Sequence, residues 1–162
     1  MTNLEKSALY QLIEQFGVSS QTGESKVTGG GYTLKYNVPQ GFVESEYSDE
    51  EYKMYMDEDF NSINVSINKT SVDKYMKDLD EEYILTSKLY KNQTISDTNS
   101  VNINGKEYKL RGIKYNDEYS SYMNLYFAYK LDEEHCYVVE VESEDGKISM
   151  DVVKIFLDVN VQ

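Results

Sequence analysis

Apolar residues near the N-terminus predict an amphipathic helix over residues 3–16. They recur at intervals of three and four residues, which is the spacing of one helical face: Leu9, Leu12, Ile13 and Phe16. The segment 18–31 is polar and glycine-rich without periodicity, which is typical of a flexible linker. We therefore expect an N-terminal helical segment over 1–17 that either packs on the following domain or serves as a partner-binding or anchor-proximal segment.

From Tyr32 onward, alternation of apolar and polar residues predicts β-strands. The first strand covers about 32–38, and a hairpin follows over 51–56 and 60–67. Each of these segments places its apolar residues on one face, so we expect one face of the sheet to contact a core.

Helical spacing then predicts one helix over about 71–89 and a last helix over about 148–157. Between them, alternation predicts further strands over about 93–103, 106–115, 121–131 and 136–143, with the strong hairpin signal Asn-Gly between the first two. The last two of these strands each have a second face that is mixed and not polar throughout. Something should therefore cover part of that face.

The order of the elements is three strands, a helix, four strands and a helix. Because tight turns join most of the strands, this order predicts an antiparallel β-sheet with helices against its faces. The fold class is therefore α+β, as an α/β/α sandwich, in one domain over 32–162.

The composition excludes several function classes. The 162 residues carry a formal net charge of −13, with one His and one Cys. Arg111 is the one arginine, and phosphate binding requires clustered Lys and Arg, so we expect no nucleic-acid partner. One His and one Cys cannot complete a tetrahedral zinc site, and one Cys cannot form an internal disulfide. We expect no metal and no cofactor.

Targeting signals are not visible in the sequence. No apolar run approaches the ~20 residues of a membrane helix, so we expect no direct membrane insertion. The N-terminus lacks the basic start and apolar stretch of a signal peptide. The protein is either cytoplasmic, or it is extracytoplasmic at the cell surface and its export signal or anchor has been removed from this chain.

Tyrosines interleaved with acids are the candidate binding residues. The chain has 16 Tyr against 5 Phe, and the stretch 44–59 holds many acids against Lys53. Two alternatives remain open, a solvated acidic edge that resists aggregation and a docking surface for a basic protein or a cationic wall component. In the second, Tyr supplies contact area and the acids steer association. The candidate residues are Tyr47, Glu50, Glu51, Tyr52, Tyr55, Asp57, Asp59, Tyr115, Asp117, Tyr119 and Tyr122.

His135 and Cys136 invite a catalytic interpretation because a thiol beside an imidazole can act as a nucleophile. Neighbours on a strand point to opposite faces, so the imidazole should not reach the sulfur. The sequence contains no phosphate-binding loop, serine nucleophile elbow or metalloprotease helix. We therefore expect that the protein is not an enzyme.

The segment Asp57-x-Asp59-x-Asn61 begins like a calcium-binding loop, in which alternate oxygen ligands converge on the ion. The rest departs from that pattern, because Ser62 stands where the loop needs Gly and Asn68 where it needs Glu. A hairpin turn is the better interpretation, with calcium binding as the alternative.

Several segments occur in a characteristic order along the chain. They are a strand ending in Tyr36-x-Val38-Pro39-x-Gly41-Phe42, a hairpin ending in Ile63-Asn64-Val65-Ser66-Ile67, a helix, Ile103-Asn104-Gly105-Lys106, two Tyr-rich strands and an apolar helix. In these features the chain resembles proteins of the Mog1/PsbP-like fold over about 32–160. Within this fold it looks most like DcrB-like lipoprotein domains of Gram-positive bacteria. The resemblance implies accessory binding and not catalysis, and it supplies no site residues, since fold does not imply function.

The expected function is a non-catalytic protein-interaction or accessory domain of a cell-surface lipoprotein or membrane-tethered protein. The alternative is a cytosolic adaptor that binds a partner, or a second copy, through its N-terminal helix. The oligomeric state has no signal in the sequence.

Overall fold

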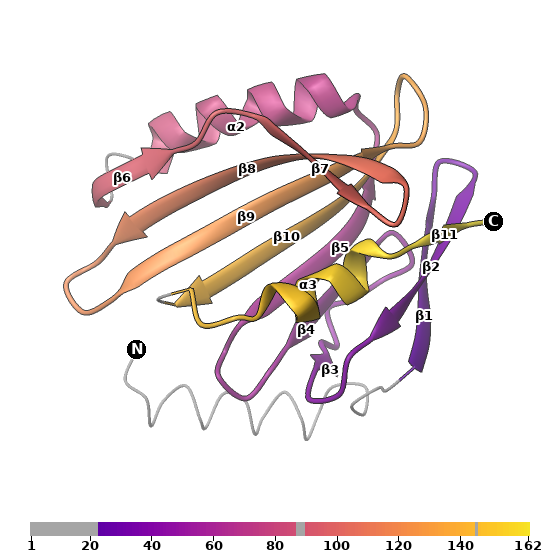
Figure 1. Cartoon of the computed structure of the whole chain (residues 1–162), viewed down its shortest axis with the longest axis horizontal. Helices are drawn as coiled ribbons and strands as arrows, with labels where there is room; N and C mark the ends of the chain where they lie inside the picture. Colours follow the sequence, from indigo (N-terminus) through magenta and orange to yellow (C-terminus); the bar gives the residue numbers. More distant parts are fainter. Residues whose placement is uncertain (1–22, 87–89, 145) are drawn as a thin grey trace.

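A computed structural model describes residues 23–86, 90–144 and 146–162, so the helix predicted over 1–17 lies outside the described residues. These residues form eleven strands and two helices (Figure 1). The strands are β1 (Gly23–Gly29), β2 (Tyr32–Val38), β3 (Val43–Glu44), β4 (Tyr52–Met56), β5 (Ser62–Asn68), β6 (Lys91–Ile95), β7 (Asn99–Ile103), β8 (Lys106–Asn116), β9 (Ser121–Lys130), β10 (Cys136–Glu144) and β11 (Asn160–Val161). The helices are α2 (Val72–Thr86) and α3 (Met150–Leu157).

Eight strands form one antiparallel sheet in the order β3-β4-β5-β10-β9-β8-β6, with β7 also paired to β8. Strand β10 lies in the middle, and its two faces contact different helices. Tyr137, Val139 and Val141 join the core under α3, whereas Cys136 and Val138 join the core under α2. The two helices therefore cover opposite faces of the sheet (Figure 1), which confirms the predicted α+β fold.

The prediction of a flexible linker over 18–31 is wrong from residue 23 onward. Strand β1 pairs with β2 along its whole length. Gly30 and Gly31 form the turn between them with φ of 58° and 85°, values that a two-residue hairpin needs and that glycine adopts without strain. The glycines that suggest a linker in the sequence therefore mark a tight hairpin.

Strand β2 is also the middle strand of a second, small sheet, in the order β1-β2-β11. The tip of the β1–β2 hairpin is bonded to the turn between β9 and β10, because the Tyr32 hydroxyl donates to Asp132 Oδ2 at 2.6 Å and Asp132 Oδ1 lies 3.0 Å from His135 Nδ1. The Tyr32 hydroxyl is the main cause that lowers the pKa of Asp132 to about 2. The bond from Tyr32 attaches the small sheet to the large one, and the Asp132–His135 contact lies within the turn that receives it.

The strand predicted over 93–103 is in fact two strands, β6 and β7. At the break, Ser96 N donates to Gly112 O at 2.9 Å and Gly112 N donates to Ser96 Oγ at 2.8 Å. A side-chain oxygen thus replaces the backbone carbonyl that would continue the ladder, and the chain leaves β8 until Asn99. Strands β3 and β11 have two residues each, which is too short for alternation to predict.

Helix α2 is fixed to the sheet by the buried side chain of Arg111 on β8. Its Nη1 donates to Met76 O at 2.8 Å, its Nε donates to Ser96 O at 3.0 Å, and its Nη2 lies 2.8 Å from Asp80 Oδ1. One guanidinium therefore satisfies backbone carbonyls of the helix and of the β6–β7 connection at once, which a single ammonium cannot do.

We predict that Arg111→Lys lowers the free energy of unfolding by roughly 1–3 kcal/mol, because at least one buried carbonyl loses its donor. Asp80→Asn should lower it by less than about 1 kcal/mol, since the Asp80 side chain is 56% exposed and its ion pair is screened by solvent. Denaturant unfolding measures both. A Lys variant as stable as the unmodified chain would contradict this role of Arg111.

Candidate interaction site

Strand alternation gathers tyrosines and glutamates on the side of the sheet that carries α2. On β10, the residues that follow Val138 on this face are acids, and each lies opposite a residue of β9, with Glu140 beside Tyr126 and Glu144 beside Tyr122. We call this surface the tyrosine–glutamate face. Its residues are Tyr52, Tyr75, Tyr115, Tyr122, Tyr126, Glu140, Glu142 and Glu144.

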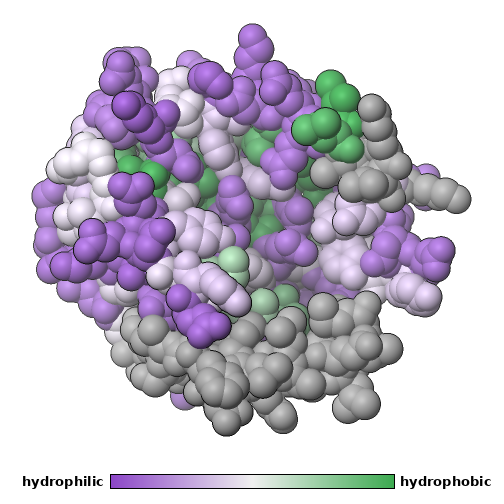
Figure 2. Space-filling model, turned by 180° about the vertical axis from the view of Figure 1, so that it is seen from behind, coloured by the Kyte–Doolittle hydropathy of each residue, from purple (hydrophilic) through white to green (hydrophobic). Residues whose placement is uncertain are grey.

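Figure 2 shows the molecule from this side. Hydrophilic side chains surround a hollowed centre, and apolar atoms are visible at its bottom (Figure 2). The hollow arises because α2 packs over β6, β8 and β9. The acidic half of β10 is therefore bordered by side chains of its neighbouring strands and is not covered by the helix.

Glu140 is the carboxylate of the face that contacts α2. Tyr75 on α2 donates its hydroxyl proton to Glu140 Oε1 at 3.1 Å. Burial raises the pKa of Glu140 above its usual range, with Glu82 and Glu142 adding like-charge repulsion. Burial, followed by the negative charge of Glu140, also raises the pKa of Tyr75 and of Tyr52. The tyrosines therefore stay neutral around a carboxylate that is held partly out of water.

Three tyrosine rings contact one another at the end of the face where β8 and β9 meet, and one of the two pairs is stacked. The ring of Tyr115 lies 4.5 Å from that of Tyr90 and 5.1 Å from that of Tyr122, the second pair with an interplanar angle of 17°. Burial, then the Asp117 carboxylate, raises the pKa of Tyr122 to about 12. Rings at these separations contribute about 0.5–1.5 kcal/mol per pair beyond area burial, so these contacts stabilise this end of the face.

The sequence-predicted binding residues divide into several places. Tyr52, Tyr115 and Tyr122 lie on the tyrosine–glutamate face. Sequence reasoning missed the glutamates of β10, although the change from Cys136 and Val138 to acids within one alternating face is a signal that could have indicated them.

The predicted acidic edge over 44–59 is not one surface. Glu50 and Glu51 precede β4, where their carbonyls accept from Thr28 N and Ile67 N, whereas Asp57 and Asp59 follow β4. Five residues of extended chain separate the two groups by roughly 16 Å. The strand between them turns its side chains to two different faces, so proximity in sequence does not bring these acids together.

Tyr55 is the one candidate that the structure removes from the surface. It is 1% exposed, and its hydroxyl lies 2.7 Å from the Tyr36 hydroxyl and 3.3 Å from Glu44 Oε1. It points to the opposite face from Tyr52 because odd and even residues of β4 alternate. Its inclusion as a binding residue is therefore wrong, while Tyr47, 79% exposed, lies in the loop between β3 and β4.

Asp117 and Tyr119 lie in the turn between β8 and β9. Asp117 Oδ1 accepts from Tyr119 N and from Ser120 N, both at 2.7 Å, and these backbone donors lower the pKa of Asp117. The carboxylate closes the turn, while the Tyr119 side chain remains 86% exposed. Asp117 thus has a structural role whether or not the turn contacts a partner.

The loop that resembles a calcium site is a side-chain-stabilised turn. Asp57 Oδ1 accepts from Asp59 N and Asn61 N, and Asp57 Oδ2 accepts from Asn61 Nδ2 at 2.8 Å. Burial is the main influence on Asp57 and raises its pKa. Across residues 23–86, 90–144 and 146–162, no three His, Cys, Asp or Glu side chains are grouped as metal ligands.

The predicted separation of His135 from Cys136 agrees with the structure. His135 Nδ1 faces the Asp132 carboxylate in the β9–β10 turn, whereas Cys136 is fully buried under α2. Burial raises the pKa of the Cys136 thiol to about 12, so a thiolate is disfavoured at neutral pH. The pair therefore has neither the contact nor the ionisation that a nucleophile needs.

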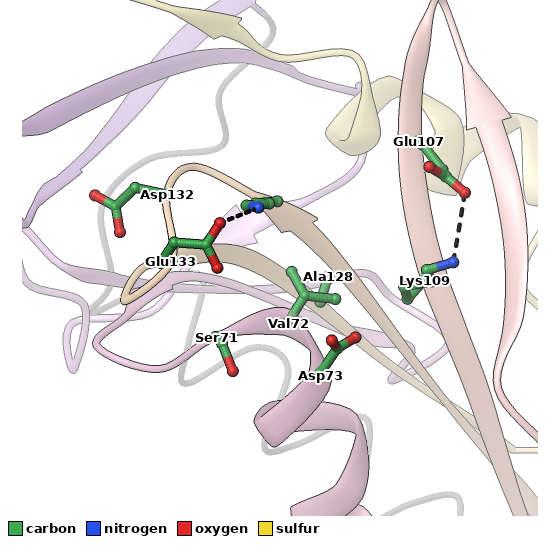
Figure 3. Close-up of a pocket in the computed structure, with 9 residues that line it drawn as sticks. Ser71, Val72, Asp73, Glu107, Lys109, Ala128, Asp132 and Glu133 are labelled. Atoms are coloured by element: carbon green, nitrogen blue, oxygen red, sulfur yellow. Dashed lines mark hydrogen bonds and ion pairs between the residues drawn. The ribbon is translucent and has the colours of Figure 1, made fainter.

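A hollow of about 160 Å³ lies at the start of α2 (Figure 3). Lys130 Nζ lies 2.6 Å from Glu133 Oε1 and Lys109 Nζ lies 3.4 Å from Glu107 Oε1. Asp132 points away from the hollow in Figure 3. Because each lysine already faces a carboxylate, the hollow has no surplus positive charge for an anion.

Among the described helices, none is long and apolar enough to cross a bilayer.

No family model matches the sequence, and no curated protein is similar to it. Solved structures do share its fold. LpqN of Mycobacterium tuberculosis, described as involved in cell envelope biogenesis, has a TM-score of 0.58 at 13% identity, covering 95% of this chain and 96% of LpqN. Cyanobacterial PsbP (CyanoP) from Synechocystis sp. PCC 6803 has a TM-score of 0.53 at 12% identity, covering 88% of this chain and 94% of CyanoP.

A protein of Bacteroides thetaiotaomicron also has a TM-score of 0.58 at 13% identity. The match covers 88% of this chain and 49% of that protein, so this chain spans about half of its length. At these identities the likeness concerns the fold, and it confirms the resemblance to the Mog1/PsbP-like fold. The comparisons give no support for DcrB-like lipoproteins of Gram-positive bacteria as nearest relatives.

The raised pKa of Glu140 predicts a measurable pH dependence of stability. Between the ordinary pKa of glutamate and the raised one, the folded chain binds more protons than the unfolded chain, so stability from this group falls as pH rises through that window. Glu140→Gln keeps an acceptor for Tyr75. It should raise Tm by a few degrees at pH 7, and the difference should vanish below the ordinary glutamate pKa.

The matched control is Glu134→Gln in the exposed β9–β10 turn, which should change the free energy of unfolding by less than about 0.5 kcal/mol. Thermal unfolding from pH 3 to pH 8 compares the three proteins. A Glu140→Gln variant that is destabilised at pH 7 would show that the carboxylate is stabilising where it lies.

Proposed function

We propose that this chain is a non-catalytic interaction domain of the cell envelope that binds a basic segment of a partner protein through the tyrosine–glutamate face. The observation that carries the proposal is the row Glu140, Glu142 and Glu144 on the middle strand. Carboxylates two residues apart on a strand lie about 6.6 Å apart on one face. Tyr122 and Tyr126 on β9 lie beside this row, and Tyr115 lies one strand further on β8, so tyrosines supply contact area on one side of the charge.

Partial burial distinguishes this surface from a device for solubility. Acids that only keep a protein soluble belong on exposed positions, where ionisation costs little. Glu140 and Glu144 are half-buried, and burial raises the pKa of Glu140. Cationic groups of a partner would offset the cost of that charged form, which gives the face a preference for basic segments.

The envelope location and the absence of catalysis are parts of the same proposal. The fold is shared with LpqN, described as involved in cell envelope biogenesis, which supports an extracytoplasmic location for this chain. We propose that it is tethered there as a lipoprotein domain of a Gram-positive bacterium, in keeping with the resemblance to DcrB-like domains. The separation of His135 from Cys136 supports a binding role without chemistry.

We predict that an oligolysine peptide binds this face and that binding weakens with salt, because the attraction between exposed charges is screened. Amide shift changes in an NMR titration should map to β9 and β10. The double variant Glu142→Gln/Glu144→Gln should weaken binding about tenfold at low salt. The matched control, Glu50→Gln/Glu51→Gln, removes the same charge just before β4, outside the tyrosine–glutamate face. It should weaken peptide binding less than twofold.

Equal loss in both double variants would mean that net charge, and not this face, attracts the peptide. Binding of a cationic oligosaccharide without binding of oligolysine would replace the protein partner by a wall component. Either result would overturn the proposal of a basic protein partner.

A further inference from the structure

A hollow lies on the side of the large sheet that carries α3, opposite the tyrosine–glutamate face. Its volume is about 360 Å³, and ligand pockets measure about 300–1,000 Å³. Leu110 and Gly112 on β8 and Leu125 on β9 form its floor. All of its lining residues belong to the described part of the chain.

Two features of the fold leave this space open. Helix α3 has eight residues and packs mainly against β2 and β10 (Figure 1). On the other side, the chain leaves β8 after Ile95 and pairs with it again from Asn99, so no strand continues the ladder beside Gly112. Leu110 and Leu125 pack against the core under α3 and are nevertheless only half-buried. An apolar floor is therefore left facing solvent.

Gly112 gives the hollow its flat floor. Its φ is not positive, so the backbone conformation does not require glycine at this position. A Cβ at Gly112 would lie 3.2 Å from Leu125 Cδ2. A glycine inside a strand often marks a place where a ligand approaches the backbone, and an aromatic ring can cover such a glycine in a sheet. The cross-strand partner of Gly112 is Leu125, and no aromatic residue of the described chain lines the hollow.

Lys114 places a positive charge at the edge of this floor. It lies between Thr94 on β6 and Met123 on β9 in the register of the sheet. Its side chain is exposed and has no ion-pair partner among the described residues. A carboxylate of a ligand that lies on the floor would pair with this ammonium.

The strongly negative chain leaves this hollow without acids. Val139 and Val141 of β10 belong to the core under α3, so alternation directs the glutamates of β10 to the opposite face. Among the described residues, no Asp or Glu lines the hollow. The net charge of −13 repels anions at long range, but physiological salt screens charges beyond about 8 Å. Lys114 therefore determines the local preference.

We propose that this hollow binds a planar aromatic monocarboxylate, with its rings on the floor at Gly112 and its carboxylate at Lys114. A cavity of about 150 Å³ accommodates benzene, so the space here is sufficient for two fused rings. The Met123 thioether, which also lines the hollow, adds a favourable contact with an aromatic edge. This site goes beyond the proposed function because it lies on the other side of the sheet and needs no protein partner.

Other ligand classes fit the hollow less well. A cation would be repelled by Lys114. A dianionic phosphate is bound by clustered Lys and Arg, and among the described lining residues Lys114 is the one cation. A saturated chain or ring would leave part of the flat backbone at Gly112 uncovered, whereas a planar ring contacts it over its whole face.

The test compares an aromatic acid with two molecules of similar size. The ligands 2-naphthoate, 2-naphthamide and decahydro-2-naphthoate are titrated into the full chain, and the Gly112 amide and Leu125 methyl groups are followed by NMR. We expect 2-naphthoate to bind at least fivefold more tightly than the other two and to shift a Leu125 methyl upfield by its ring current. Equal binding of all three, tighter binding of the saturated acid, or no shift at Gly112 would overturn the proposal.

Two variants separate the charge from the shape of the floor. Lys114→Gln should weaken 2-naphthoate binding at least fivefold and remove the preference over 2-naphthamide. Gly112→Ala should also weaken it at least fivefold, because the added methyl group occupies the floor. Lys154→Gln, which removes an exposed lysine of α3, and Gly29→Ala, at a glycine of β1 without a positive φ, are the matched controls and should leave binding within twofold.

The charge variant keeps the test decisive. Lys114 is exposed, so Lys114→Gln should retain the fold even where Gly112→Ala lowers the melting temperature. Unchanged affinity for 2-naphthoate in Lys114→Gln would refute the assignment.

This proposal and the proposed function fail separately because they concern opposite faces of the sheet. Binding of 2-naphthoate without binding of oligolysine would leave the hollow as a site and remove the basic protein partner. Binding of oligolysine without binding of 2-naphthoate would remove the hollow and leave the docking surface.

Discussion

The middle strand of the large sheet has to be covered on both sides, and this constraint determines the rest of the molecule. From Cys136 to Val139, four consecutive residues of β10 are fully buried, which is possible only because α2 and α3 lie on opposite faces. Val138 is the last residue of this strand in the core under α2, and beyond it α2 contributes the Tyr75 hydroxyl to Glu140. The next residues on that face contact both the protein interior and solvent. Tyrosine does so with its ring and hydroxyl, and glutamate does so with its half-buried methylene groups and its carboxylate.

Tyrosine hydroxyls also donate hydrogen bonds within the core of this chain, which lacks tryptophan. The Tyr137 hydroxyl donates to Phe156 O at 2.9 Å and the Tyr108 hydroxyl donates to Leu157 O. The last carbonyls of a helix have no partner within the helix itself. Two core tyrosines therefore complete the end of α3 from inside the protein, where solvent does not reach.

The fold was predictable wherever a periodic pattern was long enough. Strands β2, β5, β8, β9 and β10 and both helices follow from alternation or helical spacing, whereas β1 does not, because Gly29, Gly30 and Gly31 indicate a linker equally well. The candidate site was predictable only in part. Alternation fixes which residues of one strand share a face, but Tyr52 and Tyr122 meet the acids of β10 through strand order, which a single sequence does not encode locally.

The small sheet determines how the domain would respond to a pulling force. Strands β1 and β11 both pair antiparallel with β2, one on each side of it, so they run in the same direction. Gly23 lies opposite Val38 at one end of β2, and Val161 lies opposite Leu34 toward the other end. Tension applied between Gly23 and Val161 would slide β1 and β11 along β2 and load the hydrogen bonds of each strand pair together, over seven residue pairs on the β1 side and two on the β11 side. Such a shear arrangement resists extension more than peeling does.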